Sequence, residues 1–201
     1  AEINGKKVGS IGDMGCFSFQ GAKIAIGGQG GAIVTNNSDL FKKIKILASY
    51  GRTDSQMQYW SDFIGWNYTM PNLPAALASS QLKRIDSLLL KKERIFNIYR
   101  EKFRASDCLR LIENSPGTKS TYCYPCIQID PKAMRPRAEI INELNSLNID
   151  ARPAQPQISN MPMFNLDSSS PNSKIVEDYG LILPSAFNLS EKEVEFVSQS
   201  L

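Results

Sequence analysis

A hydroxyl and an amine lie five residues apart near the start of the chain. Ser18 carries the hydroxyl and Lys23 the amine, and four glycines follow within residues 27–31. Glycine permits positive φ angles and a close approach of the backbone to a ligand. This combination suits a site that holds a phosphate group and presents an amine to an electrophilic carbon. A glycine-rich turn with a solvated lysine beside it is the plainer interpretation, and the spacing alone leaves both open.

The chemistry available to this polypeptide is restricted because it contains no histidine among its 201 residues. Ser-His-Asp and Cys-His nucleophiles, HExxH zinc sites and histidine general bases are therefore excluded within it. The glycine-rich stretch is neither a GxGxxG nor a Walker A sequence, which argues against a nucleotide-binding loop. We expect no metal site, and any catalysis must depend on lysine, carboxylates, tyrosine, cysteine or a bound cofactor.

Charge and hydropathy give only weak indications of a partner. The chain has 23 basic and 20 acidic residues, which gives a formal net charge of +3. The basic residues are spread along the sequence, so we expect no nucleic-acid partner, and a small anionic ligand suits this charge equally well. No apolar run is long enough to cross a bilayer, and the N-terminal residues lack the apolar stretch of a signal peptide. We therefore expect no membrane contact and a cytoplasmic location.

The four cysteines are too few and too unevenly placed for a disulfide scaffold, so we expect them to be reduced. Cys123 and Cys126 form a CxxC pair, which is a candidate redox motif. The residues around them alternate as in a strand, with Tyr122 and Tyr124 opposite Cys123, and a strand offers no helix dipole to lower a thiol pKa. Structural packing is therefore the favoured interpretation of this pair.

Short strands and turns are predicted over the first seventy residues. Strands are expected at 15–19, 24–26 and 31–35, in a sheet covered on both faces. Ser38 is expected to cap a helix over 39–49 that ends at Tyr50-Gly51. The strand side chains that we expect to be buried are Phe17, Ile24, Ile26, Ile33 and Val34.

A long helical pattern follows, from about Leu73 to Phe103. At roughly 1.5 Å per residue such a helix reaches across a whole domain and often joins two lobes. The remainder predicts a smaller α+β unit. Its expected elements are a strand at 121–129, a helix at 137–147, a loop at 153–173 and a last helix that begins with a Ser190–Glu193 capping box. Because the first residue is not Met and the sequence enters a strand-like segment at once, we expect a piece of a longer chain.

Segments distributed over nearly the whole sequence resemble the DegT/DnrJ/EryC1/StrS family of pyridoxal-phosphate-dependent nucleotide-sugar aminotransferases. They occur in the family's order, which makes the resemblance far more specific than any single motif. The segments are Gly12–Phe19 with Lys23, Gly28–Thr35, Tyr50–Arg52, Gly65–Leu77 with Gln81-Leu82, Arg152-Pro153, Met161–Phe164 and Leu183–Ser185.

The fold implied by this resemblance is α/β, a pyridoxal-phosphate-dependent transferase of fold type I. Residues 1–85 would form the C-terminal part of the large cofactor-binding domain. Residues 86–201 would form the small C-terminal α+β domain. The 201 residues would then be the second part of a chain roughly twice as long.

The resemblance also implies a set of site residues. Lys23 would carry the pyridoxal phosphate as a Schiff base and move the proton between substrate and cofactor, while the cofactor serves as electron sink. Ser18 would contact the cofactor phosphate. Asn67 would reach the phosphate of the neighbouring subunit's cofactor, which makes a homodimer the expected working unit. The plainer interpretations are a surface lysine, a strand hydroxyl and a turn-stabilising asparagine.

The implied reaction moves an amino group from an amino acid to a keto nucleotide-sugar, for surface polysaccharide or lipopolysaccharide synthesis. L-glutamate is the expected donor. The Met-Pro-Asn-Leu segment at 70–73 and the Arg152-Pro153 loop most resemble enzymes that act on 4-keto hexoses, as in perosamine-type pathways. Arg152 is a candidate contact for the nucleotide diphosphate, and an ordinary exposed arginine is the plainer interpretation.

Three residues depart from the family pattern. Gln29 replaces a usual glutamate, Tyr50 a usual histidine and Thr69 a frequent arginine. In addition, the aspartate that pairs with the pyridine nitrogen would precede Ala1 and is not in this sequence. We therefore expect the 201-residue piece by itself to be inactive, and a second hypothesis stays open: a catalytically incompetent fragment or homologue that keeps only a folding and dimerisation role.

Overall fold

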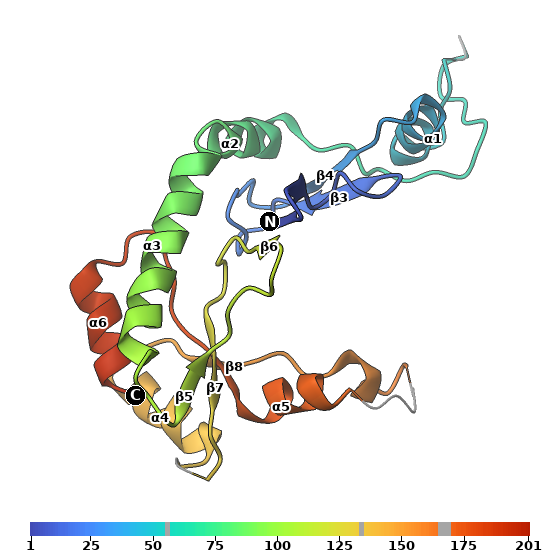
Figure 1. Ribbon diagram of the computed structural model, residues 1–201. Helices are drawn as coiled ribbons and strands as arrows, with labels where there is room; N and C mark the ends of the chain where they lie inside the picture. Colours follow the sequence, from blue (N-terminus) through green and yellow to red (C-terminus); the bar gives the residue numbers. More distant parts are fainter. Residues whose placement is uncertain (55–56, 133–134, 165–169) are drawn as a thin grey trace. The chain divides into compact units, whose positions relative to one another are not determined.

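The computed structural model describes residues 1–54, 57–132, 135–164 and 170–201, and the chain forms two compact units (Figure 1). Unit 1 comprises Ala1–Asp86 and Ser115–Ser120, and unit 2 comprises Ser87–Asn114 and Thr121–Leu201. The assignment of residues 1–85 to a large domain and of 86–201 to a small domain stays a prediction.

Unit 1 is built from short antiparallel strands and two helices. One sheet has the order β2-β1-β6 and the other pairs β3 with β4. The bounds in this unit are β1 (Glu2–Ile3), β2 (Lys6–Lys7), β3 (Gly15–Ser18), β4 (Gly31–Val34), α1 (Ser38–Ala48), α2 (Asn72–Leu82) and β6 (Thr118–Lys119).

The β3–β4 pair carries apolar side chains that are largely exposed. Phe17 is 44% exposed, Ile33 50% and Val34 46%. The prediction of buried strands in a doubly covered sheet is therefore wrong for these positions, because no other strand of the described chain joins the β3–β4 sheet. The segment 24–26 is not a strand either, although Ala25 is buried. A small core forms from Phe19, Ala25 and Ala78, with Ala32, Met70 and Ile85 packed against it.

Helix α1 begins and ends through local backbone geometry. Its N-cap is Asn37 instead of the expected Ser38: the Asn37 side chain accepts hydrogen bonds from the backbone N–H groups of Asp39 and Leu40. The helix ends at Ala48 with Ser49 as its C-cap, and the expected pair, Tyr50 and Gly51, follows directly with positive φ at both residues. Glycine is required at position 51, because a Cβ there would lie 1.8 Å from the Phe63 carbonyl oxygen.

Unit 2 contains a four-stranded antiparallel sheet with the strand order β5-β7-β9-β8. Helices precede, separate and follow these strands along the sequence. No helix within the described ranges is both long and apolar enough to cross a membrane. The bounds in this unit are α3 (Ile85–Phe103, whose first two residues belong to unit 1), β5 (Leu109–Leu111), β7 (Cys126–Ile129), α4 (Arg137–Ser146), β8 (Arg152–Pro153), the 3₁₀ helix η1 (Ile158–Asn160), α5 (Pro171–Tyr179), β9 (Gly180–Ile182) and α6 (Glu191–Gln199).

An extensive apolar core holds unit 2 together. Helices α3, α4 and α6 and strands β5, β7 and β9 all contribute buried residues to it, among them Tyr99, Ile127 and Leu144, each 0% exposed. The predicted capping box of α6 is confirmed. The Ser190 hydroxyl accepts from the Glu193 backbone N–H at 3.3 Å, and the Ser190 N–H donates to the Glu193 carboxylate at 2.7 Å.

Three further predicted elements differ from the structure. The expected continuous helix over 73–103 is divided into α2 and α3 by a turn at Lys83-Arg84. The expected strand over 121–129 begins only at Cys126, because Tyr122 has a positive φ and Pro125 has no N–H to donate to a ladder. This removes the alternation on which the packing interpretation of the CxxC pair relied. The expected loop over 153–173 overlaps the start of α5.

Lys92 on α3 is a buried cation without a carboxylate partner among the described residues. It is 7% exposed, and its ammonium donates to the Ser185 carbonyl, to the Ser185 hydroxyl at 3.0 Å and to the Cys123 carbonyl at 3.4 Å. It also lies 4.7 Å from the centre of the Phe187 ring. Burial lowers the pKa of Lys92 below its ordinary 10.5, and the Cys123 thiolate opposes this shift when it is charged.

This lowered pKa predicts a pH-dependent stability. Between the folded-state pKa of Lys92 and 10.5, the unfolded chain binds the proton more tightly than the folded chain, so stability rises as the pH increases through that window. We expect the free energy of unfolding of the wild type to rise relative to that of Lys92→Met over this range. Urea unfolding at a series of pH values measures the difference.

Lys91→Met removes an exposed lysine from the same helix and is the matched control. The difference in unfolding free energy between wild type and this control is expected to stay constant over the same pH range. An equally constant difference for Lys92→Met would contradict the prediction.

Candidate cofactor site

The predicted hydroxyl and amine lie on one loop of unit 1. Ser18 is the last residue of β3 and is opposite Gly31 at the start of β4. The base of the loop is closed by backbone hydrogen bonds, from Phe19 N–H to the Gly30 carbonyl at 2.9 Å and from Gly27 N–H to the Phe19 carbonyl at 2.7 Å. The backbone thus fixes where the loop leaves the strand and where it returns.

A tight turn at the other end of the loop carries Lys23. The Lys23 N–H donates to the Gln20 carbonyl at 2.9 Å, and the Ala22 N–H donates to the Gln20 side-chain oxygen at 2.8 Å. Gln20 therefore accepts both of the hydrogen bonds that hold the backbone of this turn.

Glycine is needed on the return side of the loop. Gly28 and Gly30 have φ angles of +81° and +94°. A Cβ at Gly31 would lie 2.4 Å from the Phe17 carbonyl oxygen, whereas the space around a Cβ at Gly28 is open. The pairing of β3 with β4 therefore requires a residue without a side chain at position 31. The backbone at Gly28 stays accessible to a ligand.

The charge of this loop is that of Lys23 alone. No other charged residue occurs between Asp13 and Asp39 in the sequence. The Lys23 side chain is exposed, and its amine makes no hydrogen bond or ion pair within the part of the chain that the structure describes. A positive charge without a neighbouring carboxylate is available to an anionic ligand, and a free amine is available to a carbonyl carbon.

Ser18 suits an anion for a related reason. Its side-chain oxygen accepts from the Gln20 N–H at 3.4 Å. Because that bond uses an oxygen lone pair, the hydroxyl proton remains available to donate to a phosphate oxygen. A phosphate-bearing aldehyde such as pyridoxal phosphate therefore fits the residues present: a hydroxyl donor, accessible backbone at Gly28 and a free amine.

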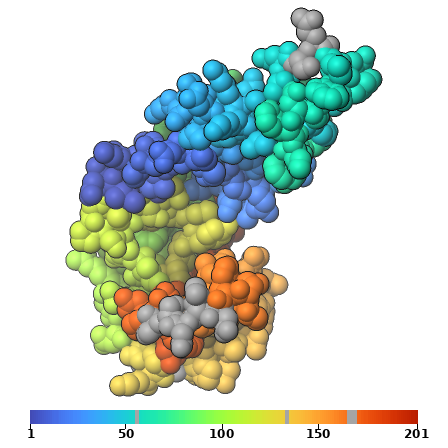
Figure 2. Space-filling view, turned by 90° about the vertical axis from the view of Figure 1, so that its right-hand side faces the viewer, coloured from blue at the N-terminus to red at the C-terminus, as the bar shows by residue number. Residues whose placement is uncertain are grey.

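Asn67 lies on a different segment of unit 1. It forms an isolated antiparallel bridge with Ser49, just after α1, and the Tyr68 N–H donates to the Ala48 carbonyl at 2.9 Å. The segment that follows α1, teal in Figure 2, accordingly lies against the light-blue α1 helix. The Asn67 side chain is exposed, and its oxygen accepts from the Thr69 hydroxyl at 3.4 Å. Within the described ranges Asn67 makes no hydrogen bond to Ser18 or Lys23.

Arg152 lies in unit 2 at the edge strand β8. Its guanidinium forms a bidentate pair with Asp150, through hydrogen bonds of 2.9 and 2.7 Å. This pair raises the pKa of Arg152 further above its ordinary value. The carboxylate offsets the charge that a nucleotide diphosphate would require, so the role of Arg152 as a diphosphate contact stays a prediction.

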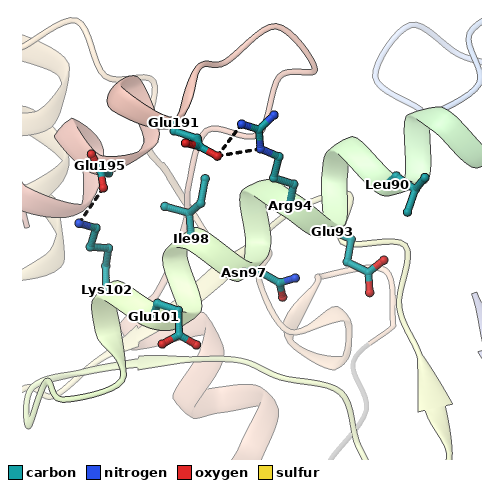
Figure 3. Close-up of a pocket in the computed structure, with 9 residues that line it drawn as sticks. All are labelled: Leu90, Glu93, Arg94, Asn97, Ile98, Glu101, Lys102, Glu191 and Glu195. Carbon is teal, nitrogen blue, oxygen red and sulfur yellow. Dashed lines mark hydrogen bonds and ion pairs between the residues drawn. The ribbon is translucent and has the colours of Figure 1, made fainter.

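A large surface hollow lies elsewhere in unit 2 and contains none of the predicted site residues. It measures about 670 Å³ and is lined by residues of α3 and α6, with Leu90 and Ile98 among them (Figure 3). Arg94 pairs with Glu191, and Lys102 pairs with Glu195 at 2.9 Å, which links the two helices. All four ion-pair side chains are at least one-third exposed, so these contacts contribute little to stability.

Gln20 is the residue of this loop that sequence reasoning missed. A glutamine is neither titratable nor a typical turn former, so its type gives no signal. Its position midway between the hydroxyl and the amine is the one feature of the sequence that draws attention to it. Only the structure shows its side-chain oxygen bound to the Ala22 N–H.

The chain is similar in sequence and in fold to several proteins whose names describe enzymes of sugar metabolism. GDP-perosamine synthase from Caulobacter vibrioides is 32% identical over 205 residues, covering 100% of this chain and 55% of that protein. The Helicobacter pylori aminotransferase PseC, involved in pseudoaminic acid biosynthesis, superposes with a TM-score of 0.88 at 25% identity, covering 97% of this chain and 54% of PseC. The Escherichia coli GDP-4-keto-6-deoxy-D-mannose-3-dehydratase with bound hydrated pyridoxal phosphate shares the fold, with a TM-score of 0.85 at 18% identity and coverage of 100% and 57%.

The chain spans about half the length of the proteins that it matches. Its fold is accordingly part of the fold-type I architecture of pyridoxal-phosphate-dependent aminotransferases, as expected from the sequence. Pyridoxal phosphate is the cofactor of these enzymes, and the Lys23 loop has the groups to receive it. The DegT/DnrJ/EryC1/StrS aminotransferase family matches residues 1–201, and the chain therefore belongs to this family.

Proposed function

We propose that the full-length protein that contains these 201 residues, called the intact protein below, transfers an amino group from an amino acid to the keto carbon of a nucleotide-linked sugar, with Lys23 as its catalytic residue. The observation that carries this proposal is the exposed Lys23 amine, which has no ion pair in the described chain and lies on one loop with the Ser18 hydroxyl. A solvated structural lysine would need neither this hydroxyl nor the glycines beside it.

Lys23 has two tasks in this proposal. Its Nζ would hold pyridoxal phosphate covalently, with the aldehyde oxygen leaving as water, and the amine of the donor would then take its place. The freed Lys23 amine would act as the proton carrier, with Nζ accepting the proton from the donor's α-carbon. When bound, pyridoxal phosphate supplies the electron sink that stabilises the deprotonated carbon. Because lysine performs the proton transfer, the absence of histidine is no obstacle.

Ser18 is the proposed contact for the cofactor phosphate, together with the accessible backbone near Gly28. We expect Ser18→Ala to weaken pyridoxal phosphate binding about ten-fold or more, because a hydrogen bond to a charged group contributes about 1.5–3 kcal/mol. An absorbance titration of the intact protein measures the affinity.

Two serine variants serve as controls for this titration. Ser18→Thr keeps the hydroxyl and is expected to keep most of the affinity. Ser10→Ala removes an exposed hydroxyl that donates to the Lys7 carbonyl, and it is expected to bind as the wild type does. Wild-type affinity in Ser18→Ala would contradict the role of this hydroxyl.

Asn67 is proposed to reach the cofactor of a second subunit, which makes the working unit a homodimer. Its separation from the Lys23 loop supports this arrangement, because its side chain is exposed and contacts neither Ser18 nor Lys23 in the described residues. Exposed aromatic and aliphatic side chains on the same segment, including Phe63, Ile64 and Trp66, are typical of a protein interface.

The names of the relatives support the proposed substrate class. The name GDP-perosamine synthase describes a protein that makes a nucleotide-linked amino sugar, and PseC acts in the biosynthesis of pseudoaminic acid. We extend this to a keto nucleotide-sugar acceptor and an L-glutamate donor in surface polysaccharide or lipopolysaccharide synthesis. A cytoplasmic location, as expected from the sequence, stays a prediction.

The test of the proposal is covalent mapping of the cofactor. The intact protein is incubated with pyridoxal phosphate, the visible absorption band is recorded, and the adduct is fixed with borohydride. Peptide mass spectrometry is expected to find the pyridoxyl group on Lys23, and L-glutamate is expected to bleach the band before reduction. A protein without a band, or with the group on other lysines, would instead support the catalytically incompetent homologue.

A further inference from the structure

The turn that carries Lys23 depends on the side chain of Gln20. Its side-chain oxygen accepts from the Ala22 N–H at 2.8 Å, and its backbone carbonyl accepts from the Lys23 N–H at 2.9 Å. Its own N–H donates to the Ser18 hydroxyl oxygen at 3.4 Å. One residue therefore has hydrogen bonds to both proposed cofactor ligands and to the residue that precedes the catalytic amine.

The backbone of Gln20 is anchored independently of this side chain. Gln20 forms a parallel bridge with Gly28, and both Phe19 and Gly27 take part in backbone hydrogen bonds beside it. Because the Gln20 backbone is fixed, its side chain starts from a fixed position. The hydrogen bond from the Ala22 N–H to the Gln20 side-chain oxygen therefore restricts the backbone position of Ala22, the residue before Lys23. Lys23 itself has a long, flexible side chain, and a fixed Cα position reduces the set of places that its amine reaches.

We infer that Gln20 is a positioning residue for Lys23: its side-chain oxygen holds the turn so that the amine lies within reach of the carbonyl carbon of a cofactor whose phosphate is bound by Ser18. The inference rests on the proposed function of Lys23. Misplacement of a reacting group by about 1 Å costs up to about 10²-fold in rate, so a single hydrogen bond at this turn has a measurable effect.

Two substitutions separate the hydrogen bond from the bulk of the side chain. Gln20→Met keeps the length but removes the acceptor, whereas Gln20→Glu keeps an acceptor oxygen for the Ala22 N–H. Gln29→Met is the matched control for the exchange measurement, because Gln29 is an exposed glutamine of the same loop whose side chain makes no hydrogen bond in the described residues.

The first measurement needs no cofactor. Amide hydrogen exchange of the intact protein is followed at Ala22, with fragmentation that resolves single residues. We expect exchange to be about five-fold faster in Gln20→Met, the factor that corresponds to ~1 kcal/mol of hydrogen-bond free energy. Gln20→Glu and Gln29→Met are expected to exchange at the wild-type rate.

The second measurement uses the loaded enzyme with donor and acceptor. We expect the kcat of Gln20→Met to fall about ten-fold while the KM for the donor stays constant. A purely structural role would leave kcat unchanged once the protein is folded and loaded. Faster exchange at Ala22 together with a lower kcat in Gln20→Met, with the exchange rate restored in Gln20→Glu, is the result that supports the inference.

The opposing results are distinct. Unchanged exchange at Ala22 in Gln20→Met, or faster exchange with wild-type kcat, would overturn the positioning role while leaving Lys23 as the catalytic residue. A wild type that takes up no pyridoxal phosphate at Lys23 would overturn the proposed function, and the inference about Gln20 with it.

Discussion

Lys23→Ala is expected to lower the rate of amino transfer by at least about 10⁴-fold, because the variant lacks both the covalent attachment point and the proton carrier. The loop around residue 23 is held by Gln20 and by backbone hydrogen bonds at its base, so alanine at this exposed position leaves the fold intact. The measurement is the steady-state rate with L-glutamate and a keto nucleotide-sugar, together with the borohydride-fixed pyridoxyl content.

Lys6→Ala is the matched control for this prediction. Lys6 is an exposed lysine of β2 in the same unit, outside the Lys23 loop. We expect this variant to keep the wild-type rate and the wild-type pyridoxyl content. A Lys23→Ala protein that retains more than a small fraction of the wild-type rate would contradict the catalytic role of this residue.

Mixing Lys23→Ala with Asn67→Ala, at a cofactor concentration too low to load Asn67→Ala by itself, extends the same prediction to Asn67. If Asn67 acts on the neighbouring subunit's cofactor, a mixed dimer of Lys23→Ala and Asn67→Ala contains one site with both residues intact. Random mixing in equal amounts is then expected to restore about a quarter of the wild-type rate, because half of the dimers are mixed and each has one complete site. No recovery in demonstrably mixed dimers would contradict a contribution of Asn67 across the interface.

Leu144→Ala is expected to destabilise unit 2 by about 3 kcal/mol, within the range of about 2–5 kcal/mol found for buried leucines. Leu144 on α4 is 0% exposed and belongs to the core that α3, α6 and the sheet share. Truncation removes apolar contacts and leaves a cavity that these rigid elements fill only in part. Urea unfolding of the intact protein followed by circular dichroism measures the shift of the transition.

Leu147→Ala provides the same substitution at an exposed position. Leu147 is the C-cap residue of α4, three residues after Leu144, and is 44% exposed. We expect a loss below about 1 kcal/mol for this variant, because its side chain contacts water in both states. Equal losses for the two leucines would show that the core of unit 2 does not depend on α4 as the structure indicates.

The helices of unit 2 were largely predictable from the sequence. Apolar spacing defines α4 and the long helix that contains α3, and the Ser190–Glu193 pair defines the start of α6. These signals are local, because a cap and an amphipathic face depend on residues within one or two turns. The break at Lys83-Arg84 was not predictable, since the apolar pattern continues through it and neither glycine nor proline marks it. Ile85 packs in unit 1, whereas Ile95 packs in unit 2, a difference that only the tertiary structure shows.

The candidate site was predictable in part. The types and spacing of Ser18, Lys23 and the following glycines indicated a phosphate and an amine, and the family match supports that interpretation. The exposure of Phe17 and Ile33 was not predictable, because apolar strand residues look alike whether or not another element covers them. The backbone conformation at the CxxC pair was likewise not predictable: β7 begins only at Cys126, so Cys123 lies outside the strand.

The sequence by itself therefore determined the family and the fold class, and it indicated Ser18, Lys23 and Asn67 as candidate site residues, because these depend on residue types and on the order of segments along the chain. The tertiary structure alone decided how they are held. It closed the Lys23 loop between β3 and β4, linked Gln20 to Ala22, and buried Lys92 among carbonyl groups. Such contacts join side chains to backbone groups whose positions depend on the whole chain, and no local pattern contains that information.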